Sequence, residues 1–253
     1  MPQTSDRFTD RVDNYVKYRP SYPLELLTYL QNNFDFGSQS ICADIGSGTG
    51  IFSEILLKNG NRVYSVEPNN EMREAAERNL IQYANFTSVM GTADSTSLQD
   101  HSIDFIFCAQ SLHWFANAKT AAEFKRILKS NGKLAIIWNK KAYYQSKFME
   151  GIRHIFIHDG IDFLSVKMEN IEDEIILHDL LQAPFQKFSM NTKQTFHSYD
   201  ELLGRLLSIS YIPQQGHPKY EGFERNLKAL YEKYKNEKGE VEYLYETVMY
   251  VFT

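Results

Sequence analysis

The sequence predicts a doubly wound α/β fold whose central sheet is mostly parallel. Between residues 40 and 138, short apolar runs alternate with amphipathic helical patterns. Strands and helices that alternate at this spacing form right-handed βαβ units, which build a parallel sheet. After residue 140 the alternation stops, and two longer runs with a period of two residues appear. We expect these two runs to add an antiparallel edge and to bring the sheet to seven strands.

The expected elements follow one another with short connections. Strands are predicted at SICADIG (40–46), NRVYSVEP (61–68), NFTSVMG (85–91), SIDFIFCAQ (102–110), KLAIIWN (133–139), FQKFSMNTKQTFH (185–197) and VEYLYETVMYVFT (241–253). Apolar residues three and four positions apart predict helices at 24–34, 50–60, 71–80, 118–132, 141–180, 198–210 and 222–236. Asn69 or Asn70 is expected to cap the helix over 71–80, and Gly132 to follow the end of the helix that begins at residue 118.

The chain of 253 residues is read as a single domain over 1–253. Residues 1–38 form an N-terminal helical cap, 39–140 the ligand-binding core, and 141–253 a helical lid with the C-terminal strands. No Lys- or Arg-rich run accompanies the net charge of −5, so we do not expect a nucleic-acid partner. No apolar run reaches the roughly 20 residues of a membrane span.

Cysteine and histidine usage points to a reducing compartment and to no metal site. The N-terminus has no apolar signal core, and Cys42 and Cys108 lie in predicted buried strands, so both are read as free thiols in the cytoplasm. The scattered histidines give no metal-ligand spacing.

The stretch CADIGSGTG (42–50) places Gly46, Gly48 and Gly50 directly behind a strand that contains Asp44. A P-loop would need Lys after the glycines, and a dinucleotide site would need glycine where Ile51 stands. The remaining pattern suits a ligand without phosphates, because the Asp44 carboxylate repels a pyrophosphate and attracts a cation.

Glu67, at the end of the second predicted strand, lies about 20 positions after Gly48, where dinucleotide folds place an acid that binds ribose hydroxyls. A ribose, a positive charge and no phosphate together describe S-adenosylmethionine.

At this point residues 41–138 resemble the core of the class I S-adenosylmethionine-dependent methyltransferases. ADIGSGTG matches their first motif, VEPNNEM resembles the second, and GTADSTSLQDHSIDFIF resembles the third region. RILKSNGKLAIIW is similar to the helix-turn-strand written R-x-L-K-P-G-G, with Ser130-Asn131 in place of Pro-Gly. YRPSYP and SLHWF narrow the resemblance to the methyltransferase type 11 branch that includes the trans-aconitate enzymes. The resemblance implies a Rossmann-like sheet.

The cofactor site is expected to gather residues from every motif. Asp44 should lie near the amino group of the cofactor, and Glu67 should accept both ribose hydroxyls. By the resemblance, Asp94 accepts from the adenine amine while the Ala93 N–H donates to the ring, and the N-terminal segment folds over the cofactor. The predicted cofactor residues are Tyr18, Arg19, Asp44, Gly46, Ser47, Gly48, Gly50, Glu67, Pro68, Asn69, Met72, Ala93, Asp94, Gln110 and Ser111.

The acceptor side is expected behind the fourth strand. His113 is the predicted catalytic residue, as a general base or as a ligand for an anionic substrate; a structural role beside Trp114 is the alternative. Tyr15, His113, Trp114 and Tyr211 are the predicted substrate-binding residues. The sequence after this strand is not the [ND]-P-P-[YF] of nucleic-acid amine methyltransferases.

The expected reaction is in-line methyl transfer to a small molecule, such as a carboxylate or a secondary metabolite, by a monomer or homodimer. A quinone or lipid C- or O-methyltransferase is one alternative, and a long apolar tunnel would favour it. A protein that binds the cofactor without chemistry and a nicotinamide oxidoreductase are two others.

Overall fold

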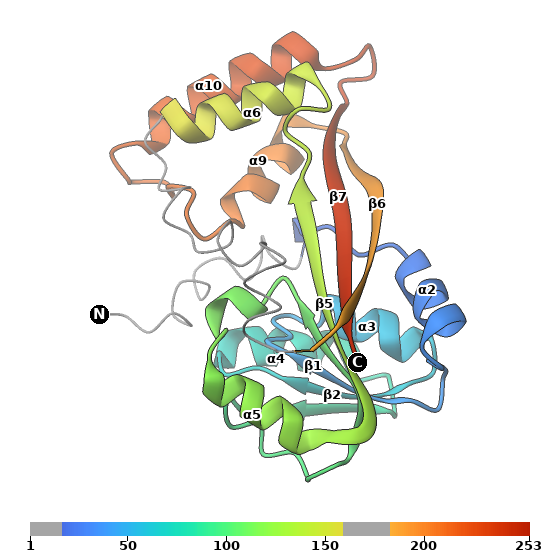
Figure 1. Ribbon diagram of the computed structural model, residues 1–253. Helices are drawn as coiled ribbons and strands as arrows, with labels where there is room; N and C mark the ends of the chain where they lie inside the picture. Colours follow the sequence, from blue (N-terminus) through green and yellow to red (C-terminus); the bar gives the residue numbers. More distant parts are fainter. Residues whose placement is uncertain (1–16, 159–182) are drawn as a thin grey trace.

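The computed structural model describes residues 17–158 and 183–253 and contains one seven-stranded sheet of order β3-β2-β1-β4-β5-β7-β6 (Figure 1). Strands β1 to β5 pair in parallel, whereas β7 runs antiparallel to both β5 and β6. The predicted mostly parallel sheet with an antiparallel C-terminal edge is therefore confirmed. The strands are β1 (Ile41–Ile45), β2 (Arg62–Val66), β3 (Phe86–Val89), β4 (Ile103–Ala109), β5 (Leu128–Lys141), β6 (Phe185–Phe196) and β7 (Val241–Phe252).

Helices cover both faces of the parallel part, as a doubly wound fold requires. Side chains alternate along each strand, so Phe105 and Phe107 pack with α2 and α3 while Ile106 and Cys108 pack with α5. The described helices are α2 (Glu25–Asn33), α3 (Ile51–Lys58), α4 (Asn70–Leu80), the 3₁₀ turn Leu112–Trp114, α5 (Ala118–Ile127), α6 (Lys147–His158), α9 (Tyr199–Leu207) and α10 (Tyr220–Tyr234).

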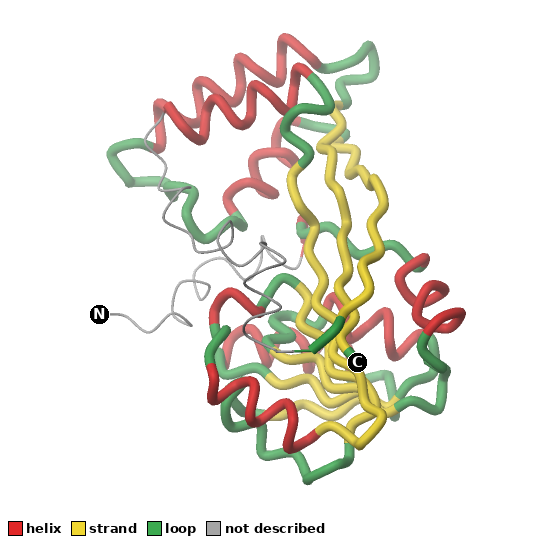
Figure 2. Tube along the Cα trace, in the orientation of Figure 1, coloured by secondary structure: helices red, strands yellow, loops and turns green. Residues whose placement is uncertain are grey.

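Strands β5, β6 and β7 extend well past the parallel strands, and helices α6, α9 and α10 gather at their far ends (Figures 1 and 2). A separate apolar cluster holds this upper part together. Its largest fully buried side chains include Phe156, Phe196, Phe223 and Tyr243. The long strands therefore carry a helical lid that has its own core.

The predicted end of one helix is wrong. The helix expected over 118–132 ends at Ile127, and Leu128 already belongs to β5, where it pairs with Ile103. Leu128 takes an extended backbone, and the chain bulges before regular pairing resumes at Lys133. The ladder with β4 replaces the helical bonds that the apolar spacing had suggested.

The helix predicted over 141–180 begins later than expected, at Lys147, because Lys141 still belongs to β5. Residues 159–180 of that range and Tyr15 lie outside the described residues. Other local predictions are confirmed. Asn69 caps α4, because its side chain accepts the N–H of Met72 at 2.8 Å. In the described ranges, no helix has the length and apolar character that crossing a bilayer requires.

Candidate active site

A cavity of about 540 Å³ lies at the carboxyl ends of the parallel strands, and residues of α9 and the loop after it form its opposite wall. Open α/β sheets bind ligands at this edge. The cavity brings together residues that the sequence predicted from six separate segments. Those that line it are Arg19, Asp44, Gly46, Ser47, Gly48, Glu67, Pro68, Asn69, Met72, Ala93, Asp94, Gln110, Ser111, His113, Trp114 and Tyr211.

The glycine loop has its backbone donors already engaged. The N–H groups of Gly46 and Ser47 both donate to the carbonyl of Val66, at 2.9 and 3.2 Å, and the N–H of Gly48 donates to Glu67 at 2.9 Å. Loops that cradle phosphates present such N–H groups to the ligand instead. This loop is therefore built to bring a ligand close to the backbone without offering it these donors.

Close packing explains why the loop begins with glycine. Gly46 has φ +68°, and a Cβ there would lie 2.8 Å from the Cβ of Ser111. The Ser111 hydroxyl donates to the carbonyl of Ile45 at 2.6 Å, so the loops after β1 and β4 are fastened together. Gln110, the first residue after β4, also has a positive φ, 58°, which is unusual for a residue with a side chain.

Asp44 is buried, with 1% of its surface exposed, and only one of its oxygens has a partner among the described residues. Ser53 donates to Oδ2 at 2.7 Å, whereas Oδ1 accepts nothing. Burial raises the pKa of Asp44 to about 7. A cationic ligand group beside Oδ1 would supply the missing partner and favour the ionised form.

Glu67 stands at the end of β2 with its carboxylate held from two sides. Oε2 accepts the N–H of Gly48 at 2.9 Å, and Oε1 accepts the N–H of Asn69 at 2.8 Å. Burial raises the pKa of Glu67, and these two N–H donors limit the increase. Each oxygen keeps a further lone pair, so the carboxylate can still accept two hydroxyl groups of a sugar.

Next to Glu67, the wall of the cavity is apolar and carries one acidic residue. Met72 and Ala93 are buried there, while Asp94 is exposed and accepts from the hydroxyl of Thr92 at 2.6 Å. An apolar slot with a carboxylate at its edge suits an adenine ring with an exocyclic amine.

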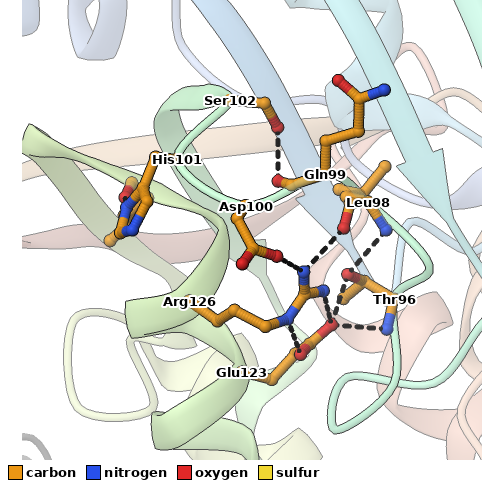
Figure 3. Close-up of polar contacts among 9 residues, drawn as sticks. Thr96, Leu98, Gln99, Asp100, His101, Ser102, Glu123 and Arg126 are labelled. Carbon is orange, nitrogen blue, oxygen red and sulfur yellow. Dashed lines mark hydrogen bonds and ion pairs between the residues drawn. The ribbon is translucent and has the colours of Figure 1, made fainter.

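A polar network anchors the segment that follows this slot (Figure 3). Glu123 of α5 accepts from both the N–H and the hydroxyl of Thr96, at 2.8 and 2.6 Å. Arg126 binds Glu123, Asp100 and the carbonyl of Leu98. The hydrogen bond from Arg126 lowers the pKa of Glu123 to about 2. Asp100 thus has a structural role in this network.

His113 lies in the cavity wall, and its ring contacts those of Trp114 and Trp138 at centroid distances of 4.6 and 5.4 Å. Burial lowers its pKa to about 3, and the nearby charges of Arg19 and Lys141 add to the effect. The imidazole is therefore neutral near pH 7. So low a pKa makes it a weak general base and a better hydrogen-bonding group.

Three predicted residues are not found in the cavity wall. Tyr15 lies outside the described residues. Tyr18 packs on α9 instead, where a Cβ on Gly204 would lie 2.3 Å from its ring. Gly50 precedes α3 with φ +85° and packs against Leu80, so its role is to turn the chain.

Sequence reasoning missed two cationic residues of the lid side. Lys141, the last residue of β5, donates to the Tyr211 hydroxyl at 3.0 Å, and Arg205 of α9 is 3% exposed. Arg205 comes from the segment after residue 140, which carries no recognisable motif, so only the fold brings it to the cavity. Ser210 and Ile209 line the cavity from the loop after α9.

The strand-end side of the cavity fits S-adenosylmethionine. Asp44 offers an unpartnered buried oxygen for the amino group, Glu67 offers acceptors for the ribose, and the loop of Gly46 and Gly48 lines the cavity between them. Within residues 17–158 and 183–253, no three His, Cys, Asp or Glu side chains come together as a metal site.

Comparison with known proteins agrees with this geometry. The family model of a methyltransferase domain matches residues 43–136. An uncharacterized methyltransferase-like protein of Schizosaccharomyces pombe is 33% identical over 135 residues, 53% of this chain and 52% of that protein. An uncharacterized methyltransferase of Mycobacterium bovis is 32% identical over 134 residues, with coverages of 53% and 52%. The chain thus spans about half the length of the curated relatives it matches.

The likeness in fold extends further. The solved structure of a candidate type II methyltransferase from Anaeromyxobacter dehalogenans superposes with a TM-score of 0.64 at 18% identity, covering 92% of this chain and 97% of that one. Residues 43–136 thus form a methyltransferase domain, and the order of the sheet and the strand-end side of the cavity agree with the class I S-adenosylmethionine-dependent methyltransferases.

Proposed function

We propose that this chain transfers a methyl group from S-adenosylmethionine to a small-molecule acceptor. The observation that carries the proposal is the carboxylate of Glu67, which the N–H groups of Gly48 and Asn69 hold at the mouth of the glycine loop. A carboxylate fixed there binds a ribose diol, and with Asp44 it makes this end of the cavity repel phosphates.

When bound, the cofactor supplies an electrophilic methyl carbon: a lone pair of the acceptor forms the new bond to it, and the electrons of the old carbon–sulfur bond stay on sulfur. The chain's own residues position and desolvate the reactants. Asp44 and Glu67 hold the cofactor, Ser111 and Gly46 fix the loops behind it, and the neutral imidazole of His113 orients the acceptor. A carboxylate nucleophile needs no base.

The lid side of the cavity supports a small polar acceptor over a quinone or lipid. Arg19, Lys141 and Arg205 line it together with Tyr211 and Asn139, so it is not a long apolar tunnel. Cys42 and Cys108 are both buried free thiols, which supports the proposal that the protein works in the reducing cytoplasm.

The test is a screen for S-adenosylhomocysteine formation against carboxylic acids, phenols, amines and quinone precursors. We expect turnover with a compact polar acceptor and none with long-chain quinones. Tight binding of S-adenosylhomocysteine without turnover of any acceptor would favour a protein that binds the cofactor and does no chemistry.

A further inference from the structure

The cavity is divided by charge along the order of the sheet. Its acids, Asp44, Glu67 and Asp94, come from β1, the end of β2 and the segment after β3. Its strong bases come from β5, from α9 and from the N-terminal segment. Because β4 lies between β1 and β5 in the sheet, Lys141 at the end of β5 lies on the other side of β4 from the acids of β1 and β2, and Arg205 lines the same cavity from α9.

Arg205 is the most deeply buried of these bases. Its Nε donates to the Tyr245 hydroxyl at 3.2 Å and its Nη1 to the Ser208 hydroxyl at 3.4 Å. The guanidinium also lies 5.9 Å from the ring centre of Tyr243. No carboxylate among the described residues comes within 4.0 Å of it. A buried charge without a counter-charge is costly, so an anionic ligand that pairs with it binds strongly.

Lys141, like Arg205, binds a tyrosine hydroxyl and lacks a carboxylate partner among the described residues. Its ammonium donates to the Tyr211 hydroxyl and lies 5.7 Å from the centre of that ring, and it has no carboxylate partner in the described part of the chain. Lys141 is also close enough to His113 to lower the pKa of the imidazole. Two cations and a neutral imidazole therefore face the acceptor side.

Two sources of an anion compete for this end, the methionine carboxylate of the cofactor and a group on the acceptor. Arg19 also lines the cavity, and its Nη2 donates to the backbone carbonyl of Ser208 at 2.8 Å, so its guanidinium lies at the end of α9. Lys141 comes from β5, on the opposite side of β4 to the acids of β1 and β2, and Arg205 lines the cavity from α9.

We propose that Arg205 and Lys141 bind an oxyanion group, a carboxylate or a phosphate ester, on the methyl acceptor. This inference rests on the proposed function and names the class of its substrate. The planar guanidinium matches both oxyanions with two parallel hydrogen bonds, and hydrogen bonds among the described residues use only two of its five N–H groups.

Arg205→Met is a suitable test because it leaves no polar partner stranded. The Tyr245 hydroxyl also donates to Gln194 at 3.4 Å, and the Ser208 hydroxyl donates to the backbone carbonyl of residue 205 at 2.6 Å. Arg205→Lys keeps the charge, and Arg225→Met, on the exposed face of α10, is the matched control.

Acceptors are compared in pairs, a carboxylic acid with its amide and a phosphate monoester with its alcohol, by formation of S-adenosylhomocysteine. We expect the anionic member of a pair to be the substrate, and Arg205→Met to lower its kcat/KM by about 100-fold or more. Arg205→Lys should recover part of this loss, and Arg225→Met should match the wild type. Equal turnover of neutral and anionic members would overturn the inference.

Two measurements need no turnover. Calorimetry with S-adenosylhomocysteine should give the same Kd for the wild type and for Arg205→Met; a large loss would assign Arg205 to the cofactor carboxylate instead. With the protein saturated with S-adenosylhomocysteine, succinate and inorganic phosphate at constant ionic strength are the probes, and at least one should raise the Tm of the wild type more than that of Arg205→Met. Equal shifts in Tm with both probes would contradict the proposed anion site.

Failure of the wild type to bind S-adenosylhomocysteine at all would refute the proposed function instead.

Discussion

Replacing Glu67 by glutamine tests the cofactor site where its geometry is best defined. The change turns one carboxylate oxygen into an NH₂ group, which must then face the N–H of either Gly48 or Asn69. It also removes the charge and one acceptor for a ribose hydroxyl. A hydrogen bond to a charged group is worth about 1.5 to 3 kcal/mol, and 1.4 kcal/mol is tenfold in affinity. We therefore expect S-adenosylhomocysteine to bind Glu67→Gln about 100-fold more weakly than the wild type.

The assay is isothermal titration calorimetry together with a thermal melt. Glu71→Gln is the matched control, because Glu71 is an exposed acid in the first turn of α4 with the same charge. Glu67→Gln should lose about 1 to 3 kcal/mol of stability, since a buried backbone donor loses its acceptor. If Glu67→Gln bound S-adenosylhomocysteine within threefold of the wild type, its proposed contact with the ribose would be refuted.

Three further predictions follow from neighbouring residues. Because folding raises the pKa of Asp44 to about 7, the folded state binds more protons than the unfolded one between about pH 4 and 7, so the stability that this group contributes falls as pH rises through that window. Asp44→Asn should flatten this slope in melts taken from pH 4 to 8. Since the ionised form of Asp44 binds the amino group, the affinity for S-adenosylhomocysteine should rise between pH 6 and 7 in the wild type and not in Asp44→Asn. His113→Ala should lower turnover at least tenfold with the Kd of S-adenosylhomocysteine unchanged; a matching loss of affinity would make His113 structural. Gly46→Ala should lower the free energy of unfolding by about 2 kcal/mol or more, because it adds a clash with Ser111 to the cost of a positive φ. Gly216 also has a positive φ but open space around it, so Gly216→Ala should lower the free energy of unfolding by only about 1 kcal/mol. Equal losses would contradict the packing argument.

The convergence of the predicted cofactor residues on one cavity could be predicted from the sequence, because they lie in or just after the ends of strands. Asp44, Glu67 and Ser111 each lie in or just after a parallel strand, and the carboxyl ends of such strands meet at one edge of the sheet. Local spacing therefore determined which side chains would converge. The same reasoning failed for Gly50, whose neighbours in space are Leu80 and Ala76 of another helix.

The lid side could not be predicted in the same way. Arg205 reaches the cavity because β5, β6 and β7 extend beyond the parallel strands and place α9 above their ends (Figure 1). Its burial depends on contacts with Tyr243 and Tyr245, about 40 residues away in the chain. A motif that spans a few neighbouring residues does not predict contacts at that separation. The early end of the helix at Ile127 has a similar cause, since pairing of Leu128 with Ile103 outweighs the helical pattern.

The most direct test of the site is a pair of titrations on one preparation, S-adenosylmethionine against NADH. Since the N–H groups of Gly46, Ser47 and Gly48 are already engaged and two carboxylates line the loop, we expect S-adenosylmethionine to bind and NADH to show no heat above dilution. Tighter binding of NADH would mean that the loop accepts a pyrophosphate, and the assignment of its ligand would be wrong.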